Sequence, residues 1–262
     1  GNGSMVTSTT PTQEIQAQRN PLRYEQPRGK LKIMFLGGVG EIGKNMTVFE
    51  YGDSIVILDA GMSFPGNDMP GVDVVIPDIS YLVEHREKIK GILLTHGHED
   101  HIGAMPFVVK KLGGKVDVYG TRLTLGLVEN KLLEHSAHDN VNFVPVSDKS
   151  IVSLGDFTAE FIHVSHSVAG SCAICLRTPV GTVFHTGDFK VDYTPLGNEI
   201  MNLNRIAEIG KQGVLLLMSE STNVEKPGYT MSESVVRETI NKVFQDAKGR
   251  RIIIATFASN VD

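Results

Sequence analysis

Residues 95–101 read Thr-His-Gly-His-Glu-Asp-His, directly after a short apolar run. In an extended segment, side chains two positions apart point the same way, so His96 and His98 can direct two ring nitrogens at one point. Asp100 and His101 follow where the chain turns into a helical pattern, and they can reach a second point nearby. Imidazole nitrogen and carboxylate oxygen are ligands for zinc and similar ions. The stretch therefore predicts a hydrolytic centre with two metal ions, rather than a polar loop of solvated histidines.

Three further candidates, Asp59, His166 and Asp188, each follow a strand-like apolar run. Their order along the chain, together with the H-x-H-x-D-H pattern, resembles the metallo-β-lactamase superfamily from about residue 31 to the end. The resemblance implies a metal-bridging role for Asp188 and a role for Asp59 in orienting a ligand by hydrogen bonding. The implied ligands are His96, His98 and His166 for one metal, and Asp100 and His101 for the other, with Asp188 between them.

Residues 216–223 read Leu-Leu-Met-Ser-Glu-Ser-Thr-Asn, and an acidic residue in this setting resembles the first motif of the β-CASP nucleases. Within that branch, residues 37–45, 185–190 and 255–260 resemble the bacterial ribonuclease J family. This chain has Glu220 where the family usually has Asp, which keeps the acceptor role and adds one methylene. It also reads Ser-Val-Ala at 167–169, where Ser-Ile-Pro is common.

The resemblance implies a metal-dependent ribonuclease that hydrolyses RNA phosphodiesters with a water activated by two metals. The expected activity is a 5′→3′ exonuclease with endonuclease activity, acting in RNA processing and decay. Asp100 and Glu220 are the expected catalytic residues, because Glu220 would orient a β-CASP histidine that protonates the leaving 3′-oxygen. The expected cofactors are two divalent ions, Zn²⁺ or alternatively Mn²⁺ or Mg²⁺. The expected partners are single-stranded RNA with a 5′-monophosphate, further copies of the chain in a dimer or tetramer, and an RNA-degradation complex.

Two alternative functions stay open. One is a smaller metallohydrolase of the thioester hydrolase type, against which the Ser-Glu-Ser-Thr segment argues. The other is a non-catalytic RNA-binding subunit of a ribonuclease complex, against which the complete set of metal motifs argues.

The apolar patterns predict α and β elements in layers, and the resemblance specifies an αββα sandwich. Residues 1–30 are expected to be a tag remnant and a flexible extension, and 31–248 a metallo-β-lactamase domain. Residues 249–262 are expected to be the first strand of a β-CASP domain whose remainder is absent. We therefore expect a fragment that folds but hydrolyses RNA weakly or not at all.

The predicted strands are 31–36, 46–51, 54–58, 91–95, 115–119, 142–146, 157–164, 171–177, 182–185, 214–218 and 251–256. The predicted helices are 79–86, 102–112, 121–135, 203–209 and 232–247. The glycines at 37, 38, 40 and 43 predict a tight turn and not a P-loop, since the Lys-Ser/Thr ending is missing.

Composition indicates a globular protein, with 41% hydrophobic and 21% charged residues. No apolar run approaches the ~20 residues that cross a bilayer, so no membrane association is expected. The net charge of −5 does not favour nucleic acid, so RNA binding would depend on metals and local charge. Lys44 and Lys190 are local candidates, although each is predicted to be a solvated surface residue, and the pair at 250–251 is predicted to mark a strand entry.

The only cysteines, Cys172 and Cys175, lie in one predicted strand. Residues three apart in a strand face opposite sides, so we expect buried structural thiols and not a disulfide or chelate. Their scarcity suits a reducing cytoplasm. Structural roles are also expected for the histidines outside the metal set: His85, His135 and His138 at the surface, His163 facing away from the metals, and His185 near them.

Overall fold

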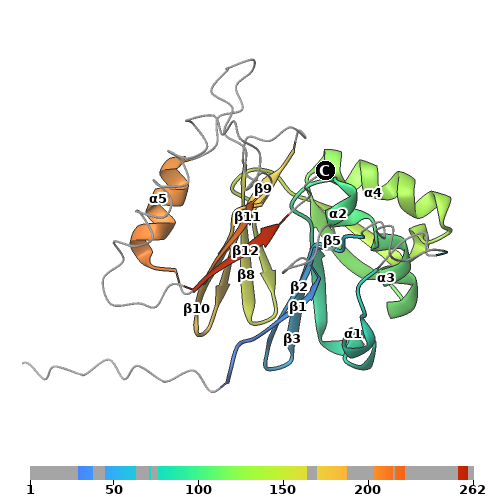
Figure 1. Cartoon of the computed structure of the whole chain (residues 1–262), viewed down its shortest axis with the longest axis horizontal. Helices are drawn as coiled ribbons and strands as arrows, with labels where there is room; N and C mark the ends of the chain where they lie inside the picture. Colours follow the sequence, from blue (N-terminus) through green and yellow to red (C-terminus); the bar gives the residue numbers. More distant parts are fainter. Residues whose placement is uncertain are drawn as a thin grey trace, which may run out of the picture.

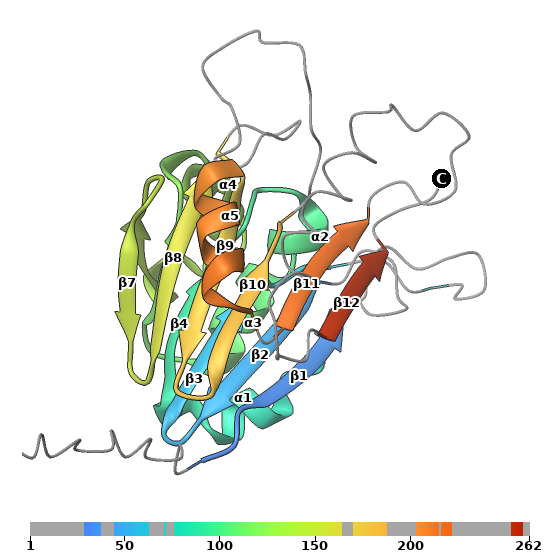
Figure 2. The ribbon, with the colours of Figure 1, turned by 90° about the vertical axis from the view of Figure 1, so that its left-hand side faces the viewer.

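Two β-sheets pack face to face and carry helices on both outer faces (Figure 1). The computed structural model describes residues 29–37, 45–62, 71, 76–163, 170–187, 203–214, 216–221 and 253–258. Each sheet has six strands. Viewed from the side of α5, the second sheet lies in front of the first (Figure 2).

The first sheet runs in sequence order from β1 to β6. Its first three strands are antiparallel, and β3 to β6 are parallel. The strands are β1 (Lys32–Gly37), β2 (Met46–Tyr51), β3 (Ser54–Leu58), β4 (Ile89–Leu93), β5 (Val116–Gly120) and β6 (Val141–Pro145). Parallel strands end at the same edge of a sheet, so the loops that follow β3 and β4 meet.

The second sheet has the order β12-β11-β10-β9-β8-β7. Strands β7 to β10 form antiparallel pairs, whereas β11 lies parallel to both β10 and β12. The strands are β7 (Ile151–Leu154), β8 (Phe157–His163), β9 (Cys172–Thr178), β10 (Gly181–His185), β11 (Leu216–Ser221) and β12 (Ile253–Ala258).

Helices α1, α3 and α4 cover the outer face of the first sheet, and α5 lies over the second sheet (Figure 1). The helices are α1 (Ser80–Glu84), α2 (Glu99–Ile102), α3 (Met105–Leu112), α4 (Arg122–Glu134) and α5 (Leu203–Gln212), with short 3₁₀ turns η1 (Arg86–Lys88) and η2 (His138–Asn140). Within the described part of the chain, no helix has both the length and the apolar character needed to span a bilayer.

Successive side chains of a strand point to opposite faces of its sheet, and this alternation creates two separate hydrophobic cores. On β3, Ile55 and Ile57 face the helices, whereas Val56 and Leu58 face the second sheet. Phe157 and Phe161 of β8 complete the core between the sheets, and both side chains are fully buried. Helices, sheet, sheet and helix follow one another as layers, so the predicted αββα sandwich is confirmed.

Two element predictions differ from the structure. The strand Ile151–Leu154 was not predicted, because its burial alternates weakly and Ile151 is 63% exposed. The predicted helix at 102–112 is shorter in the structure, because only α3 (Met105–Leu112) lies within it and a separate short helix, α2 (Glu99–Ile102), precedes it. The two helices are separate because the Ala104 amide donates to the carbonyl of Ala60, outside the helix, and Pro106 has no amide hydrogen to donate. The helix predicted at 232–247 lies outside the described residues.

Strand β12 pairs with β11 from Leu216↔Ile253 to Ser221↔Ala258 and forms one end of the second sheet. The prediction that 249–262 opens a separate domain is not tested by this pairing. Lys44, Lys190 and the pair at 250–251 lie outside the described residues.

The two cysteines are free and buried, as predicted. Cys172 packs in the core between the sheets, whereas Cys175 pairs across the strands with Glu160. Burial raises the pKa of Cys172 to about 12 and that of Cys175 to about 11. Both thiols are therefore protonated and unreactive in the folded protein near neutral pH.

An ion-pair cluster around the buried Glu160 carboxylate attaches α5 to the second sheet. The Glu160 carboxylate of β8 accepts hydrogen bonds from Arg205 Nε at 2.6 Å and Nη2 at 2.9 Å, and from Arg177 Nη1 at 3.0 Å. The Glu160 side chain is 3% exposed. The hydrogen bonds from Arg205 hold the pKa of Glu160 below its ordinary value; burial opposes this shift and Arg177 reinforces it.

Replacing Glu160 with Gln should lower the free energy of unfolding by about 1–3 kcal/mol, because two arginines lose their charged acceptor. A carboxylate with a lowered folded pKa stabilises the protein fully above its unfolded pKa of about 4.3. That contribution is lost as the pH falls through the folded pKa. Urea unfolding from about pH 7 down to pH 3 should therefore show the gap between wild type and variant shrinking with acid.

Glu84→Gln, at an exposed glutamate of α1, is the matched control and should change stability little at any pH. An equal effect of the two variants, or a gap that widens with acid, would contradict the role assigned to Glu160.

Candidate metal centre

The candidate site lies at the edge of the first sheet where β3 and β4 end. Asp59 follows β3, and Thr95 and His96 follow β4. The second sheet reaches the same place, because the amide of Cys172 at the start of β9 donates to the carbonyl of Thr95 at 2.9 Å. The side chains that bear the chemistry therefore stand on loops fixed to both sheets.

Backbone hydrogen bonds attach the first turn of α2 to Asn45, just before β2, and to the loop after β3. The Asn45 amide donates to the carbonyl of Asp100 at 3.0 Å, and the Ala60 amide donates to the carbonyl of His101 at 2.8 Å. A Cβ atom at Gly61 would overlap the backbone carbonyl of Asp100, so this approach requires glycine. These contacts fix Asp100 and His101 before any ligand binds.

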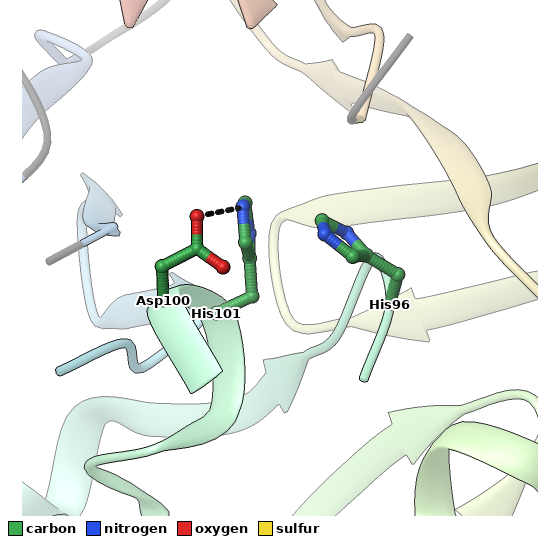
Figure 3. Close-up of side chains that lie close together, drawn as sticks. All are labelled: His96, Asp100 and His101. Carbon is green, nitrogen blue, oxygen red and sulfur yellow. Dashed lines mark ion pairs between the residues drawn. The ribbon is translucent and has the colours of Figure 1, made fainter. Parts of the chain in front are cut away.

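His96, Asp100 and His101 form a compact group (Figure 3). Each offers one ligand atom, and these atoms all lie within 4.8 Å of one another. The ring centroids of His96 and His101 are 3.9 Å apart, and His101 Nε2 lies 3.6 Å from Asp100 Oδ2. Both histidines are buried, whereas the Asp100 side chain is 26% exposed, so the group opens towards solvent on the Asp100 side.

The other members of the predicted set are placed less completely. His98 is half-buried and its ring stands edge-on to His96, with centroids 4.9 Å apart, but it is not part of the compact group. Glu99, which was not a predicted ligand, forms an ion pair with Lys131 of α4 at 2.5 Å. His166 and Asp188 lie outside the described residues. Glu220 lies on β11, and its side chain is outside the described part of the structure.

Asp59 is the centre of a buried hydrogen-bond network. Its carboxylate accepts from the Thr95 amide at 2.8 Å, from the Thr95 hydroxyl at 2.8 Å and from His101 Nδ1 at 2.7 Å. The residue is 1% exposed, and its backbone has a positive φ of 60°, which Asp tolerates better than most residues. Asp59 therefore contacts a candidate ligand and is not itself part of the compact group.

These contacts determine which nitrogen of His101 carries the proton. A carboxylate accepts only, so Nδ1 must donate to Asp59. The Asn45 side-chain amide donates to the carbonyl of Asp100 at 3.1 Å, and its nitrogen lies 3.2 Å from His101 Nε2. Nε2 therefore acts as an acceptor and keeps its lone pair towards the group. A lone pair on a buried imidazole beside a carboxylate fits a divalent metal.

His185, at the end of β10, is buried beside this network. Its Nδ1 accepts a hydrogen bond from the Gly187 amide at 3.0 Å. Burial lowers the pKa of His185 to about 4; His101 adds to this shift, and Asp59 opposes it. The ring is therefore neutral near pH 7. It also lines a small apolar cavity between the sheets, together with Leu58 and Leu93.

The remaining histidines have local partners away from the site. His85 stacks on Tyr81, His138 forms an ion pair with Glu129, and His135 lies beside Phe107. His135 is exposed as predicted, whereas His85 and His138 are partly buried.

Sequence reasoning missed Asn45 and Thr95 as functional residues. Each had a positional signal: Asn45 ends the segment 37–45 that carried the family resemblance, and Thr95 opens the histidine motif. Neither residue type is a preferred metal ligand, so the pattern of metal-binding residues does not include them.

Comparison with known proteins identifies the family. The family model described as the metallo-beta-lactamase superfamily matches residues 39–196. The chain is 49% identical over 232 residues to ribonuclease J of Synechocystis, and the match covers 88% of this chain and 36% of that protein. It is 45% identical over 240 residues to ribonuclease J of Thermus thermophilus, covering 90% and 42%. The chain thus spans well under half the length of these relatives.

Solved structures share the fold at low identity. The metallo-beta-lactamase fold protein YhfI of Bacillus subtilis aligns with a TM-score of 0.60 and 17% identity, covering 89% of this chain and 88% of that one. The short form of human tRNase Z aligns with a TM-score of 0.55 and 13% identity, covering 87% and 93%.

The fold, the order of the motifs and the family match agree with one another. The chain belongs to the metallo-beta-lactamase superfamily, and over most of its length it is homologous to ribonuclease J.

Proposed function

We propose that this chain is the metal-binding part of a ribonuclease that hydrolyses RNA phosphodiesters. The observation that supports this most is the group of His96, Asp100 and His101, held by a buried hydrogen-bond network. It occurs in a chain 41–49% identical to proteins named ribonuclease J. The site chemistry supports a metallohydrolase, and the similarity to these relatives supports RNA as the substrate.

The proposed metal ligands are those that the family resemblance implies, and three of them, His96, Asp100 and His101, form the compact group. His96, His98 and His166 would hold one divalent ion, Asp100 and His101 would hold the other, and Asp188 would be a ligand shared by both. We propose zinc, with manganese or magnesium as the alternatives. When bound, two such ions supply Lewis acidity and a water activated near neutral pH.

The side chains of this chain have distinct tasks in the proposed reaction. Asp59 orients His101 by accepting its Nδ1 proton. Asp100 is the partly exposed member of the group, so the substrate approaches on its side. An anionic phosphodiester is repelled by a bare carboxylate in a protein of net charge −5, so RNA binding should require metal. Glu220 is proposed to position the acid that protonates the leaving 3′-oxygen.

The wider role is proposed from the family resemblance of the sequence motifs. We propose a 5′→3′ exonuclease with endonuclease activity on single-stranded, 5′-monophosphorylated RNA, acting in cytoplasmic RNA processing and decay. Assembly into a dimer or tetramer and membership of an RNA-degradation complex belong to the same proposal. So does the division into a metallo-β-lactamase domain at 31–248 and a β-CASP strand at 249–262.

Removing a ligand of the compact group should lower the metal content. His101→Ala and Asp100→Ala each delete one donor, so we expect fewer bound ions per chain after loading with zinc and exhaustive dialysis. Elemental analysis by mass spectrometry measures the ratio, and circular dichroism checks the fold.

The matched control is His138→Ala, which removes a histidine paired with Glu129 away from the group. It should keep the wild-type ratio. Wild-type stoichiometry in both His101→Ala and Asp100→Ala would exclude this metal assignment.

RNA hydrolysis should depend on metal and on Asp100. We expect the chain to cleave 3′-labelled single-stranded RNA slowly when zinc or manganese is added, and EDTA or Asp100→Asn to abolish cleavage. Asp100→Asn keeps the size of the side chain and removes its charge, so core packing is unaffected. Gel analysis of 5′-monophosphate and 5′-hydroxyl substrates measures the preference, with Synechocystis ribonuclease J as the positive control.

Two results would overturn this proposal. Metal-dependent hydrolysis of a thioester with intact RNA would indicate the smaller metallohydrolase. Tight RNA binding without cleavage, unchanged in Asp100→Asn, would indicate a non-catalytic RNA-binding subunit.

A further inference from the structure

The hydroxyl of Thr95 lies between the Asp59 carboxylate and both buried histidines of the compact group. Thr95 Oγ1 is 2.8 Å from Asp59 Oδ2, 2.9 Å from His96 Nδ1 and 3.4 Å from His101 Nδ1. The residue is 1% exposed. Because this buried hydroxyl contacts a carboxylate and two imidazoles, its hydrogen bonds determine which of their atoms carry protons.

Counting donors and acceptors fixes the direction of each hydrogen bond. A hydroxyl has one proton to donate and lone pairs to accept with, whereas a carboxylate accepts only. The Thr95 proton therefore goes to Asp59 Oδ2 at 2.8 Å. Thr95 Oγ1 is left to accept, so His96 Nδ1 at 2.9 Å must carry a proton and donate it. The lone pair of the neutral His96 ring is then on Nε2.

The same tautomer is fixed in His101 by a direct route. There the Asp59 carboxylate accepts from Nδ1 itself, and the Asn45 amide donates towards Nε2. The buried Asp59 carboxylate therefore determines the tautomer of both imidazole rings. It acts on His101 directly and on His96 through the Thr95 hydroxyl. In the proposed function these two histidines belong to different metals.

We propose that Thr95 is a positioning residue, whose hydroxyl extends the control of Asp59 to His96 and so fixes the lone pair of His96 on Nε2. The inference rests on the proposed metal centre, and it adds a residue that links its two halves. Without the hydroxyl, His96 Nδ1 loses its acceptor and the ring is no longer held in the tautomer that presents Nε2 to a metal.

The variant Thr95→Val isolates the hydroxyl. Valine has nearly the same shape, and the backbone contacts of residue 95 are kept: its amide donates to Asp59 at 2.8 Å and its carbonyl accepts from Cys172 at 2.9 Å. Thr95→Ser restores the hydroxyl and omits only the methyl group. Thr124→Val is the matched control, because Thr124 is equally buried, with its hydroxyl 3.1 Å from that of Thr121 and away from the histidines.

The first readout is the tautomer of His96 in the metal-free protein. Long-range ¹H–¹⁵N correlation spectra of histidine-labelled protein distinguish the two neutral tautomers, and His96→Gln assigns the signal. We expect the Nδ1-protonated form in wild type, Thr95→Ser and Thr124→Val. In Thr95→Val the His96 signals should shift towards the Nε2-protonated form or a mixture, while those of His101 stay unchanged.

The second readout is zinc affinity, measured by competition with a chelating dye. Loss of a partner that orients a metal-binding histidine typically weakens binding by about 10–100-fold. We expect a loss of that size in Thr95→Val for one of the two ions, and wild-type affinity within a few-fold in Thr95→Ser and Thr124→Val.

The two readouts separate the failure of this inference from the failure of the proposed function. If wild type binds no zinc, the metal centre is wrong, and the tautomer spectra still decide the role of Thr95. If wild type binds zinc but Thr95→Val matches it in tautomer and affinity, Thr95 has no such role. Should Thr95→Val not fold, Thr95→Ala, which adds no bulk, takes its place with the same expected results.

Discussion

The buried carboxylate of Asp59 is the constraint on which the rest of the site depends. It joins the end of β3 to the start of the loop after β4 and to the first turn of α2. A charged group with 1% exposure is stable only when its oxygens are satisfied, and here three donors satisfy them. The same three hydrogen bonds determine the geometry of the two histidines, so folding and preparation of the site are one process.

The layers of the protein make this arrangement possible. Because β3 and β4 are parallel neighbours, the loops that follow them emerge at the same edge of the sheet. Side chains of β3 alternate between its two faces, so one set packs in the core under the helices and the other in the core between the sheets. The close approach at Gly61 then allows the chain after β3 to hydrogen-bond with Glu99, through Met62, and with His101, through Ala60. A site formed in this way is held by backbone contacts from both sides and needs little rearrangement to bind a ligand.

The sequence was informative where a residue type has few uses. Clustered His and Asp after an apolar strand predicted metal ligands within residues 96–101, although the prediction paired His96 with His98, whereas the structure groups His96 with Asp100 and His101. Period-two patterns predicted most strands. Prediction from the sequence failed where the deciding contact comes from a distant segment. The break between α2 and α3 depends on Ala60, and the role of Asn45 depends on the carbonyl of Asp100. Short β7, with exposed Ile151, has a pattern too weak to separate it from a loop. The ligand roles of His166 and Asp188 stay predictions.

The two buried cysteines of β9 can report on local opening of the protein through their reaction with alkylating reagents. Cys172 faces the core between the sheets, and Cys175 faces the layer that Glu160 shares with α5. Only the thiolate reacts with alkylating reagents, and burial suppresses it at both positions. Alkylation therefore requires local opening, and the two positions report on different openings: separation of the sheets and detachment of the helix. The chain thus carries two native probes, in one strand, for the order in which its layers come apart.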